Sequence, residues 1–233
     1  MKCLRNFLLT LALVAVLSTG VHSRSVGVIV YPGFEVLDVF GPLEYWNLLS
    51  AVNPTNLSVS VISHEVGPVS AVPPNFPSVI GQSVFATHSF NSAPNLDILM
   101  VPGGIGTWSS INDTVLLDFI KQTYPKLEYL MTVCTGSALV AKTGLLDGKM
   151  ATSNKRAFDW VSQQRPNVKW VRSARWVEDG NILTSSGVQA GMDLTNYLIG
   201  KIYNETTAKL VSDFMEYVPH KDPTWDPFAN TPK

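Results

Sequence analysis

The stretch from Leu127 to Leu146 constrains the fold more than any other part of this sequence. It begins with an apolar run, Tyr129 to Val133, which is followed by Cys134, by a glycine-containing turn and by a segment of helical composition. An apolar strand that turns sharply into a helix, with a nucleophilic side chain at the turn, is the pattern of a nucleophile elbow. Gly144 ends the helical segment as a left-handed cap would. The stretch therefore predicts a buried strand, an accessible thiol and a helix in direct succession.

Cys134 at this turn has two interpretations. The free N–H groups at the start of a helix favour an anion, so the thiol is expected to have a lowered pKa and to react as a thiolate. Cysteine is also among the most buried residue types, and most solitary cysteines are inert. The residues around Cys134 leave both interpretations open.

Length and charge narrow the class of protein. The chain has 233 residues, of which 45% are hydrophobic and 15% charged, and this composition suits one globular domain with a full core. The formal net charge is −1 and no run of basic residues occurs, so we expect no nucleic-acid partner. We expect neither a metal nor another cofactor, because no Cys, His or carboxylate cluster has ligand spacing.

Residues 1–23 have the pattern of a secretory signal peptide. A basic start precedes an apolar run, Phe7 to Leu17, which is too short to span a bilayer, and the segment Val21–Ser23 offers small residues to a signal peptidase. We expect cleavage between Ser23 and Arg24, a secreted mature chain of residues 24–233, and no membrane attachment after cleavage. An uncleaved membrane anchor is the alternative.

Cleavage would leave Cys134 as the one cysteine of the mature chain, because Cys3 lies in the signal segment. Secreted domains usually pair their cysteines, so an unpaired thiol in an oxidising compartment indicates a protected or working residue. Three Asn-X-Ser/Thr triplets, at Asn56, Asn112 and Asn204, are candidate glycosylation sites and agree with export.

Strands and helices alternate along the mature chain. The main predicted strands span residues 26–31, 57–63, 98–101, 129–133 and 182–185, and the predicted helices span 34–52, 113–124, 137–142, 156–164, 189–203 and 205–217. Gly41-Pro42 is expected to break the first helix into two pieces. Residues 64–92 are expected as edge strands and loops, and 219–233 as an extended tail over the surface. The alternation predicts one α/β domain, a sandwich around a largely parallel sheet.

Two further segments follow predicted strands. Asp38 is an acid among apolar neighbours just past the first strand, where it either caps the next helix or enters a site. Ligands of open α/β sheets bind at the carboxyl ends of the strands, which favours a site. Gly103 and Gly104 follow the strand at 98–101 and allow either a close backbone approach or an ordinary turn. Trp108, beside them, is a candidate pocket wall or a surface aromatic.

Four separated motifs resemble the ThiJ/PfpI superfamily, whose domain is related to class I glutamine amidotransferases. They are LDVFGPLE at 37–44, DILMVPGG at 97–104, VCTGSALVAKTGLLDGKMAT at 133–152 and TSSGVQAGMDL at 184–194, and they follow the family's order. The segment NKRAFDWV at 154–161 is similar to fungal members. The resemblance implies a flavodoxin-like, three-layer α/β sandwich with a nucleophile elbow, and commonly a homodimer.

The resemblance also implies a site. Cys134 is the implied nucleophile, and Asp38 is the implied carboxylate beside its sulfur. Backbone N–H donors for a developing anion are implied in the glycine loop, at Gly103 and Gly104, and at Thr135, the residue after the cysteine.

Thr135 is also where the chain departs from part of the family. Amidase- and peptidase-like members have histidine directly after the cysteine, whereas the isonitrile-hydratase branch has threonine, as here. Asn154 stands where regulator-type relatives often have histidine, and it is a second pocket candidate. His64, His88 and His220 are expected at surface or structural positions, so no Cys-His pair for acyl transfer is visible.

These implications favour a small electrophilic substrate and a lyase of the isonitrile-hydratase type. Cys134 would add to the substrate carbon, and Asp38, its pKa raised by apolar surroundings, would supply a proton. Thr135 would position the water that releases an N-substituted formamide. A glyoxalase acting on methylglyoxal, a non-catalytic stress protein whose thiol senses oxidants, and a hydrolase or amidotransferase stay open as alternatives.

Overall fold

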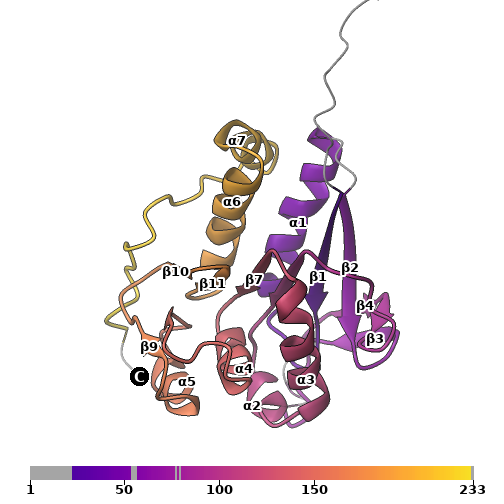
Figure 1. The fold of residues 1–233 in the computed structure, drawn as a ribbon, viewed down its shortest axis with the longest axis vertical. Helices are drawn as coiled ribbons and strands as arrows, with labels where there is room; N and C mark the ends of the chain where they lie inside the picture. The colour runs from indigo at the N-terminus through magenta and orange to yellow at the C-terminus, as the bar shows by residue number, and fades with distance from the viewer. Residues whose placement is uncertain (1–22, 54–56, 77, 79, 232–233) are drawn as a thin grey trace, which may run out of the picture.

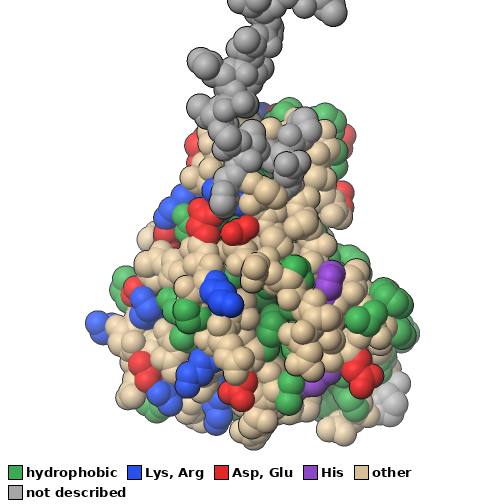
Figure 2. Space-filling model, turned by 45° about the vertical axis from the view of Figure 1, so that its right-hand side comes forward, with side chains coloured by type: hydrophobic (Ala, Val, Ile, Leu, Met, Phe, Trp, Pro, Cys, Tyr) green, Lys and Arg blue, Asp and Glu red, His purple; other side chains and the backbone are tan. Residues whose placement is uncertain are grey.

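The computed structural model describes residues 23–53, 57–76, 78 and 80–231. Residues 1–22 of the expected signal segment and the glycosylation candidate Asn56 lie outside the described residues. Within the described ranges, no helix combines the length and the apolar character needed to cross a bilayer. Figure 2 shows Lys and Arg side chains interspersed with Asp and Glu over one face of the molecule.

A seven-stranded sheet forms the centre of the described part of the chain, in the order β10-β11-β7-β6-β1-β2-β5. Every neighbouring pair is parallel except the β10–β11 hairpin, which turns at Gly180 with a φ of +67°. The inner order β2-β1-β6-β7-β11 is that of a flavodoxin-like sheet. The strands are β1 Arg24–Ile29, β2 Leu57–Ser63, β5 His88–Ser89, β6 Ile98–Val101, β7 Tyr129–Thr132, β10 Trp176–Asp179 and β11 Ile182–Ser185.

Helices cover both faces of this sheet (Figure 1). One face carries α1 Val36–Val52, α6 Ala190–Ile202 and α7 Glu205–Phe214, and the other carries α3 Thr114–Thr123, α4 Gly136–Lys142 and α5 Phe158–Gln164. Side chains of β1 point alternately to the two faces of the sheet. Val26 and Val28 pack in the core under α1 and α6, and Ile29 packs in the core under α3 and α4. The predicted three-layer α/β sandwich is confirmed.

Smaller elements lie at the ends of the sheet. They are the pair β3 Gly67–Ser70 and β4 Ser83–Ala86, the pair β8 Met150–Ala151 and β9 Lys169–Trp170, the helix α2 Thr107–Ser110 and a 3₁₀ turn at Tyr124–Lys126.

Helix α1 is continuous, so the predicted break at Gly41-Pro42 is wrong. Pro42 lies inside the helix and lacks the N–H that would bond one turn back. Burial compensates for the lost hydrogen bond, because Trp46 and Leu49 of the same helix are fully buried in the core. Gly41 allows close contact with α6, since a Cβ there would lie 2.8 Å from Cγ of Met192.

The C-terminal segment, residues 215–231, follows α7 without a further helix or strand. It is the yellow trace that runs from α7 to the neighbourhood of β9 and α5 in Figure 1. The backbone N–H of Arg175 donates to the carbonyl of Pro223 at 2.7 Å. The segment is more than the surface tail expected from its composition, because the side chain of Asp226 is fully buried.

Candidate active site

Cys134 occupies the sharp turn between β7 and α4. Its φ of +57° lies in the left-handed region, which non-glycine residues rarely adopt. The N–H of Cys134 donates to the carbonyl of Ser186 at 2.9 Å, and the carbonyl of Cys134 accepts from the hydroxyls of Ser153 and Ser137 at 2.9 and 3.2 Å. The predicted nucleophile elbow is therefore present, and hydrogen bonds on both sides of the residue hold its strained backbone.

Three segments meet at this elbow, each of them following the carboxyl end of a parallel strand. Asp38 follows β1, Gly103 follows β6 and Cys134 follows β7. The sheet order reverses between β1 and β6, which is where open α/β sheets bind ligands. Gly103 allows the loops to approach, because a Cβ there would lie 2.5 Å from the backbone nitrogen of Thr135 and 2.9 Å from Cβ of Cys134.

Asp38 is fully buried beside the thiol, and its carboxyl group is only partly hydrogen-bonded. Oδ2 accepts the N–H of Gly103 at 2.9 Å, whereas Oδ1 has no conventional hydrogen-bond partner among the described residues. Burial raises the pKa of Asp38 to about 8; the charge of Glu35 adds to this rise, and hydrogen bonds from Gly103 and Cys134 oppose it. The prediction of a raised pKa is confirmed, and Asp38 is mainly protonated at neutral pH.

The pKa of Cys134 moves in the opposite direction from the one predicted. Burial raises the pKa of the thiol well above its usual value, and the negative charge that Asp38 can carry raises it further. A hydrogen bond from the N–H of Thr135 and one from the side chain of Asn154 lower it by less. The expected lowered pKa is therefore wrong, because desolvation outweighs the donors at the start of α4. Cys134 and Asp38 both retain their protons at neutral pH.

The glycine-loop N–H groups expected to stabilise an anion are engaged inside the protein. The N–H of Gly103 donates to Asp38, and the N–H of Gly104 donates to the Thr135 hydroxyl at 3.0 Å. That hydroxyl also bonds Oγ1 of Thr107 at 2.8 Å. Of the three predicted donors, only the N–H of Thr135 is directed at the sulfur of Cys134.

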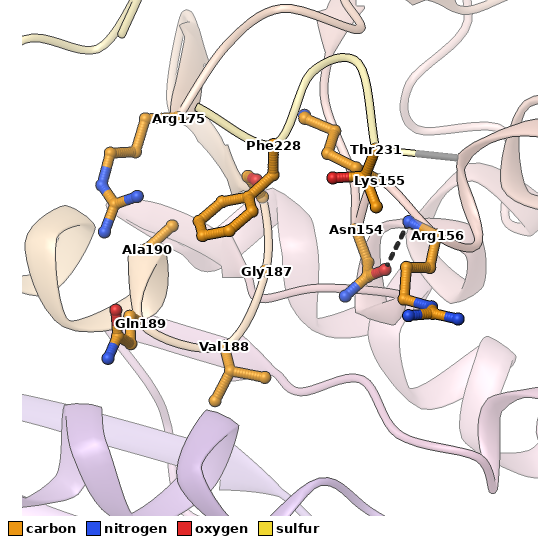
Figure 3. Close-up of a pocket in the computed structure, with 11 residues that line it drawn as sticks. Asn154, Lys155, Arg156, Arg175, Gly187, Val188, Gln189, Ala190, Phe228 and Thr231 are labelled. Carbon is orange, nitrogen blue, oxygen red and sulfur yellow. Dashed lines mark hydrogen bonds between the residues drawn. The ribbon is translucent and has the colours of Figure 1, made fainter. Parts of the chain in front are cut away.

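A cavity of about 230 Å³ lies at the thiol. Trp108 forms part of its wall and stacks on Trp160 with ring centroids 4.4 Å apart. Asn154 lines it too, and its Oδ1 accepts the N–H of Arg156 at 3.0 Å (Figure 3). This leaves the amide nitrogen of Asn154 for the hydrogen bond to Cys134. The lining residues are Glu35, Gly104, Ile105, Trp108, Cys134, Thr135, Asn154, Arg156 and Ala157.

Two charged residues of this wall were missed by the sequence reasoning, Glu35 and Arg156. Glu35 immediately precedes α1, and its charge acts on both Asp38 and Cys134. The rule that selected Asp38, proximity to the carboxyl end of β1, applies equally to Glu35 and could have found it. Arg156 has no comparable local signal, because only the course of the chain after β8 brings it to the cavity.

The histidines and the remaining candidates lie elsewhere. His64 pairs with Asp113 at 2.8 Å, His88 contacts Thr87, and His220 packs on the Trp225 ring with centroids 4.0 Å apart. None of the three histidines lines the cavity at Cys134.

The glycosylation candidates Asn112 and Asn204 are both exposed, and Asn204 also caps α7 by accepting the N–H of Thr207 at 2.8 Å. Among the residues that the structure describes, no three His, Cys, Asp or Glu side chains are grouped to hold a metal ion.

Fold and site together define an α/β protein with a cysteine at a nucleophile elbow and a buried carboxyl group beside it. Residues 24–201 match the DJ-1/PfpI family, and the chain belongs to that family. It is 31% identical to an isonitrile hydratase from Pseudomonas putida over 195 residues, which cover 83% of this chain and 78% of that enzyme.

Other relatives are named for different functions. The chain is 27% identical to the HTH-type transcriptional regulator GbdR from Pseudomonas aeruginosa, with 79% of this chain matching 50% of the regulator. Among solved structures, a ThiJ/PfpI family protein from Pseudomonas syringae superposes with a TM-score of 0.74 at 26% identity, covering 90% of this chain and 79% of that one. Family membership alone therefore leaves the activity open.

Proposed function

We propose that this protein hydrates isonitriles to N-substituted formamides, with Cys134 as the nucleophile and Asp38 as the proton donor. One observation carries the proposal: the Cys134 thiol lines a small cavity and is hydrogen-bonded to the buried, protonated carboxyl group of Asp38, and none of the described histidines lines that cavity. This pair suits addition of S–H to an unsaturated carbon, whereas acyl transfer uses a paired base such as histidine. The similarity to an isonitrile hydratase supports the same chemistry.

The reaction balances with the protons that the pair holds. The sulfur of Cys134 bonds to the terminal carbon of R–N≡C while Asp38 protonates that carbon, and the thiol proton replaces the one that Asp38 gave, which leaves a thioimidate, Cys–S–CH=N–R. Water then adds across the C=N bond. The C–S bond breaks as the new hydroxyl loses its proton to sulfur, and the products are R–NH–CHO and the free thiol. The raised pKa values of both groups match a cycle that begins fully protonated.

Thr135 and the glycine loop act as positioning residues in this proposal. Gly103 holds the Asp38 carboxyl through its N–H, and the Thr135 hydroxyl holds Gly104 in turn. The Thr135 N–H, which is directed at sulfur, would stabilise charge on the sulfur as the C–S bond forms and breaks. Asn154 would act on the sulfur from the other side.

Turnover of isonitriles by the purified mature chain tests the proposal. The wild type should convert cyclohexyl isocyanide to N-cyclohexylformamide. The loss of the isonitrile infrared band measures this conversion. Cys134→Ala should abolish turnover, and Asp38→Asn should lower it strongly. Absence of turnover in the wild type, or full activity of Cys134→Ala, would refute the assignment.

Methylglyoxal separates this proposal from the glyoxalase alternative. Isomerisation of a hemithioacetal needs Asp38 as a base, so that activity should rise with pH up to about 8, where Asp38 ionises. Isonitrile hydration needs the protonated carboxyl group, so its rate should fall above about pH 8. Turnover of methylglyoxal alone, with the rising profile, would favour the glyoxalase.

The oxidant-sensing alternative predicts stable oxidation instead of turnover. Intact mass after mild peroxide treatment should then increase by two oxygen atoms, as a sulfinic acid at Cys134. An unchanged mass would count against it.

The setting that we propose is a secreted, glycosylated homodimer. The signal pattern of residues 1–23 and the triplets at Asn56, Asn112 and Asn204 support export. Mass spectrometry of protein from culture medium should find an N-terminus at Arg24 and glycan on at least one triplet, and light scattering should give twice the chain mass. A retained protein with an intact leader would contradict export.

A further inference from the structure

The cavity at Cys134 is too small for a large substrate. Its volume of about 230 Å³ lies below the roughly 300–1,000 Å³ of typical small-molecule pockets. A second cavity of about 540 Å³ adjoins it, since Asn154 and Arg156 line both. Ser186 connects the two as well, because it lines the larger cavity and accepts the N–H of Cys134. A molecule that reacts at the thiol could therefore place its remainder in the larger space.

The C-terminal segment forms one wall of this larger cavity. Phe228 and Thr231 face the loop at Gly187 and Val188, which leads into α6. Figure 3 shows the Phe228 ring projecting into the space between Arg175 and Asn154. The full lining is Asn154, Lys155, Arg156, Arg175, Ser186, Gly187, Val188, Gln189, Ala190, Phe228 and Thr231, without an acidic side chain.

The buried cations of the wall already have partners. Nζ of Lys155 lies 3.1 Å from a carboxylate oxygen of Asp226, and Nε of Arg175 donates to Asp193 at 2.6 Å. An apolar group can therefore enter this cavity without leaving a buried charge unpaired. Its contacts would be the Phe228 ring and the apolar surfaces of Val188 and Ala190.

The Lys155–Asp226 ion pair also places the ring. The N–H of Phe228 donates to Oδ1 of Asp226 at 2.9 Å, so the residue that pairs with Lys155 also holds the backbone of Phe228. Lys155 is the direct neighbour of Asn154, whose side chain acts on the sulfur of Cys134. Buried polar contacts thus link the position of the Phe228 ring to Asn154 beside the Cys134 sulfur.

We infer that this second cavity binds the organic substituent of the isonitrile, and that Phe228 makes bulky apolar substituents the preferred ones. The inference rests on the proposed function, which supplies the reaction at Cys134. It adds a substrate class, isonitriles carrying a ring or branched alkyl group, and it gives the C-terminal segment a part in specificity.

Two isonitriles of different bulk test this inference. For the wild type, kcat/KM should be about tenfold or more higher on cyclohexyl than on methyl isocyanide, a difference typical of filling an apolar pocket. Phe228→Ala should lower kcat/KM on the cyclohexyl substrate about tenfold, mainly by raising KM. On the methyl substrate, kcat/KM should change less than about twofold. Phe228→Trp fills the cavity and keeps its apolar surface. It should also lower kcat/KM on the cyclohexyl substrate more than on the methyl substrate, because the bulky ring no longer fits. Because Phe228 is 55% exposed, these variants should keep the wild-type circular dichroism spectrum and melting temperature.

The matched control is Phe214→Ala, which truncates a 62% exposed phenylalanine of α7 that lines neither cavity. This variant should leave kcat/KM on both isonitriles unchanged. If the Phe228 variants affect both isonitriles equally, or neither, the inference is overturned while the proposed function stands. If the wild type turns over no isonitrile at all, the proposed function fails, and the inference fails with it.

Discussion

Asp38 and Asp193 are both buried aspartates, but their surroundings are opposite. Asp193 receives Nε of Arg175 at 2.6 Å, the hydroxyl of Tyr217 at 2.6 Å and the N–H of His220 at 2.8 Å. Asp38 receives one backbone N–H and no cation, and it lies beside a thiol. A carboxylate whose oxygens are satisfied stabilises the fold, whereas a carboxyl group left partly unsatisfied beside a thiol is available for proton transfer.

Replacing Asp38 should lower activity far more than replacing Asp193. Asp38→Asn keeps an acceptor for the Gly103 N–H but cannot supply the proton, so kcat/KM on an isonitrile should fall by about 10²–10⁴. Asp193→Asn, assayed on methyl isocyanide at a temperature where it is folded, should stay within a few-fold of the wild type. Similar losses in both variants would remove the functional distinction between the two aspartates.

The same substitution should change how stability depends on pH. The pKa of Asp38 is about 8 in the folded state against the ordinary 3.8 of an aspartate, so the folded state binds the proton more tightly. The associated stability is complete below about pH 4 and is lost as pH rises toward 8, by up to about 1.4 kcal/mol per pH unit. Urea titrations from pH 4 to 9 should show Asp38→Asn gaining on the wild type with rising pH. Parallel curves would contradict the raised pKa.

Asp193→Asn should instead destabilise the fold throughout the neutral range. It leaves the guanidinium of Arg175 buried without a counter-charge, which costs about 3–5 kcal/mol of unfolding free energy. The control is Asp213→Asn, which removes the exposed partner of Lys209 and should change stability by at most about 1 kcal/mol. Chemical unfolding at pH 7 measures the free energy of unfolding of both variants. Equal losses would show that the buried ion pair of Asp193 contributes no more to stability than an exposed one.

The smallest predicted effect tests the hydroxyl network beside Asp38. Thr135→Val removes the acceptor of the Gly104 N–H and the partner of Thr107, and it should destabilise the protein by about 1–3 kcal/mol. Thr135→Ser keeps the hydroxyl and should lose less than half as much. Loss of activity in both variants, without loss of stability, would instead assign the Thr135 side chain to the chemistry.

Local patterns in the sequence were sufficient for the fold and for the position of the nucleophile. The apolar run before Cys134 and the glycines after it specify a strand, a sharp turn and a helix, and all three form. Asp38 could be placed because the carboxyl ends of parallel strands share one edge of the sheet. Its raised pKa followed from apolar neighbours along the chain.

Only the tertiary structure decided how the groups of the site interact. The thiol pKa depends on burial by several separate segments, and the N–H groups of Gly103 and Gly104 find partners far away in the sequence, in Asp38 and Thr135.

The burial of Asp226 and the continuity of α1 through Pro42 have the same origin, because both depend on contacts between distant segments. Sequence periodicity reports which face of an element is buried, but it does not report which donor meets which acceptor. The elbow could therefore be read from the chain, whereas the protonation of its cysteine and the Phe228 wall of the adjoining cavity required the folded arrangement.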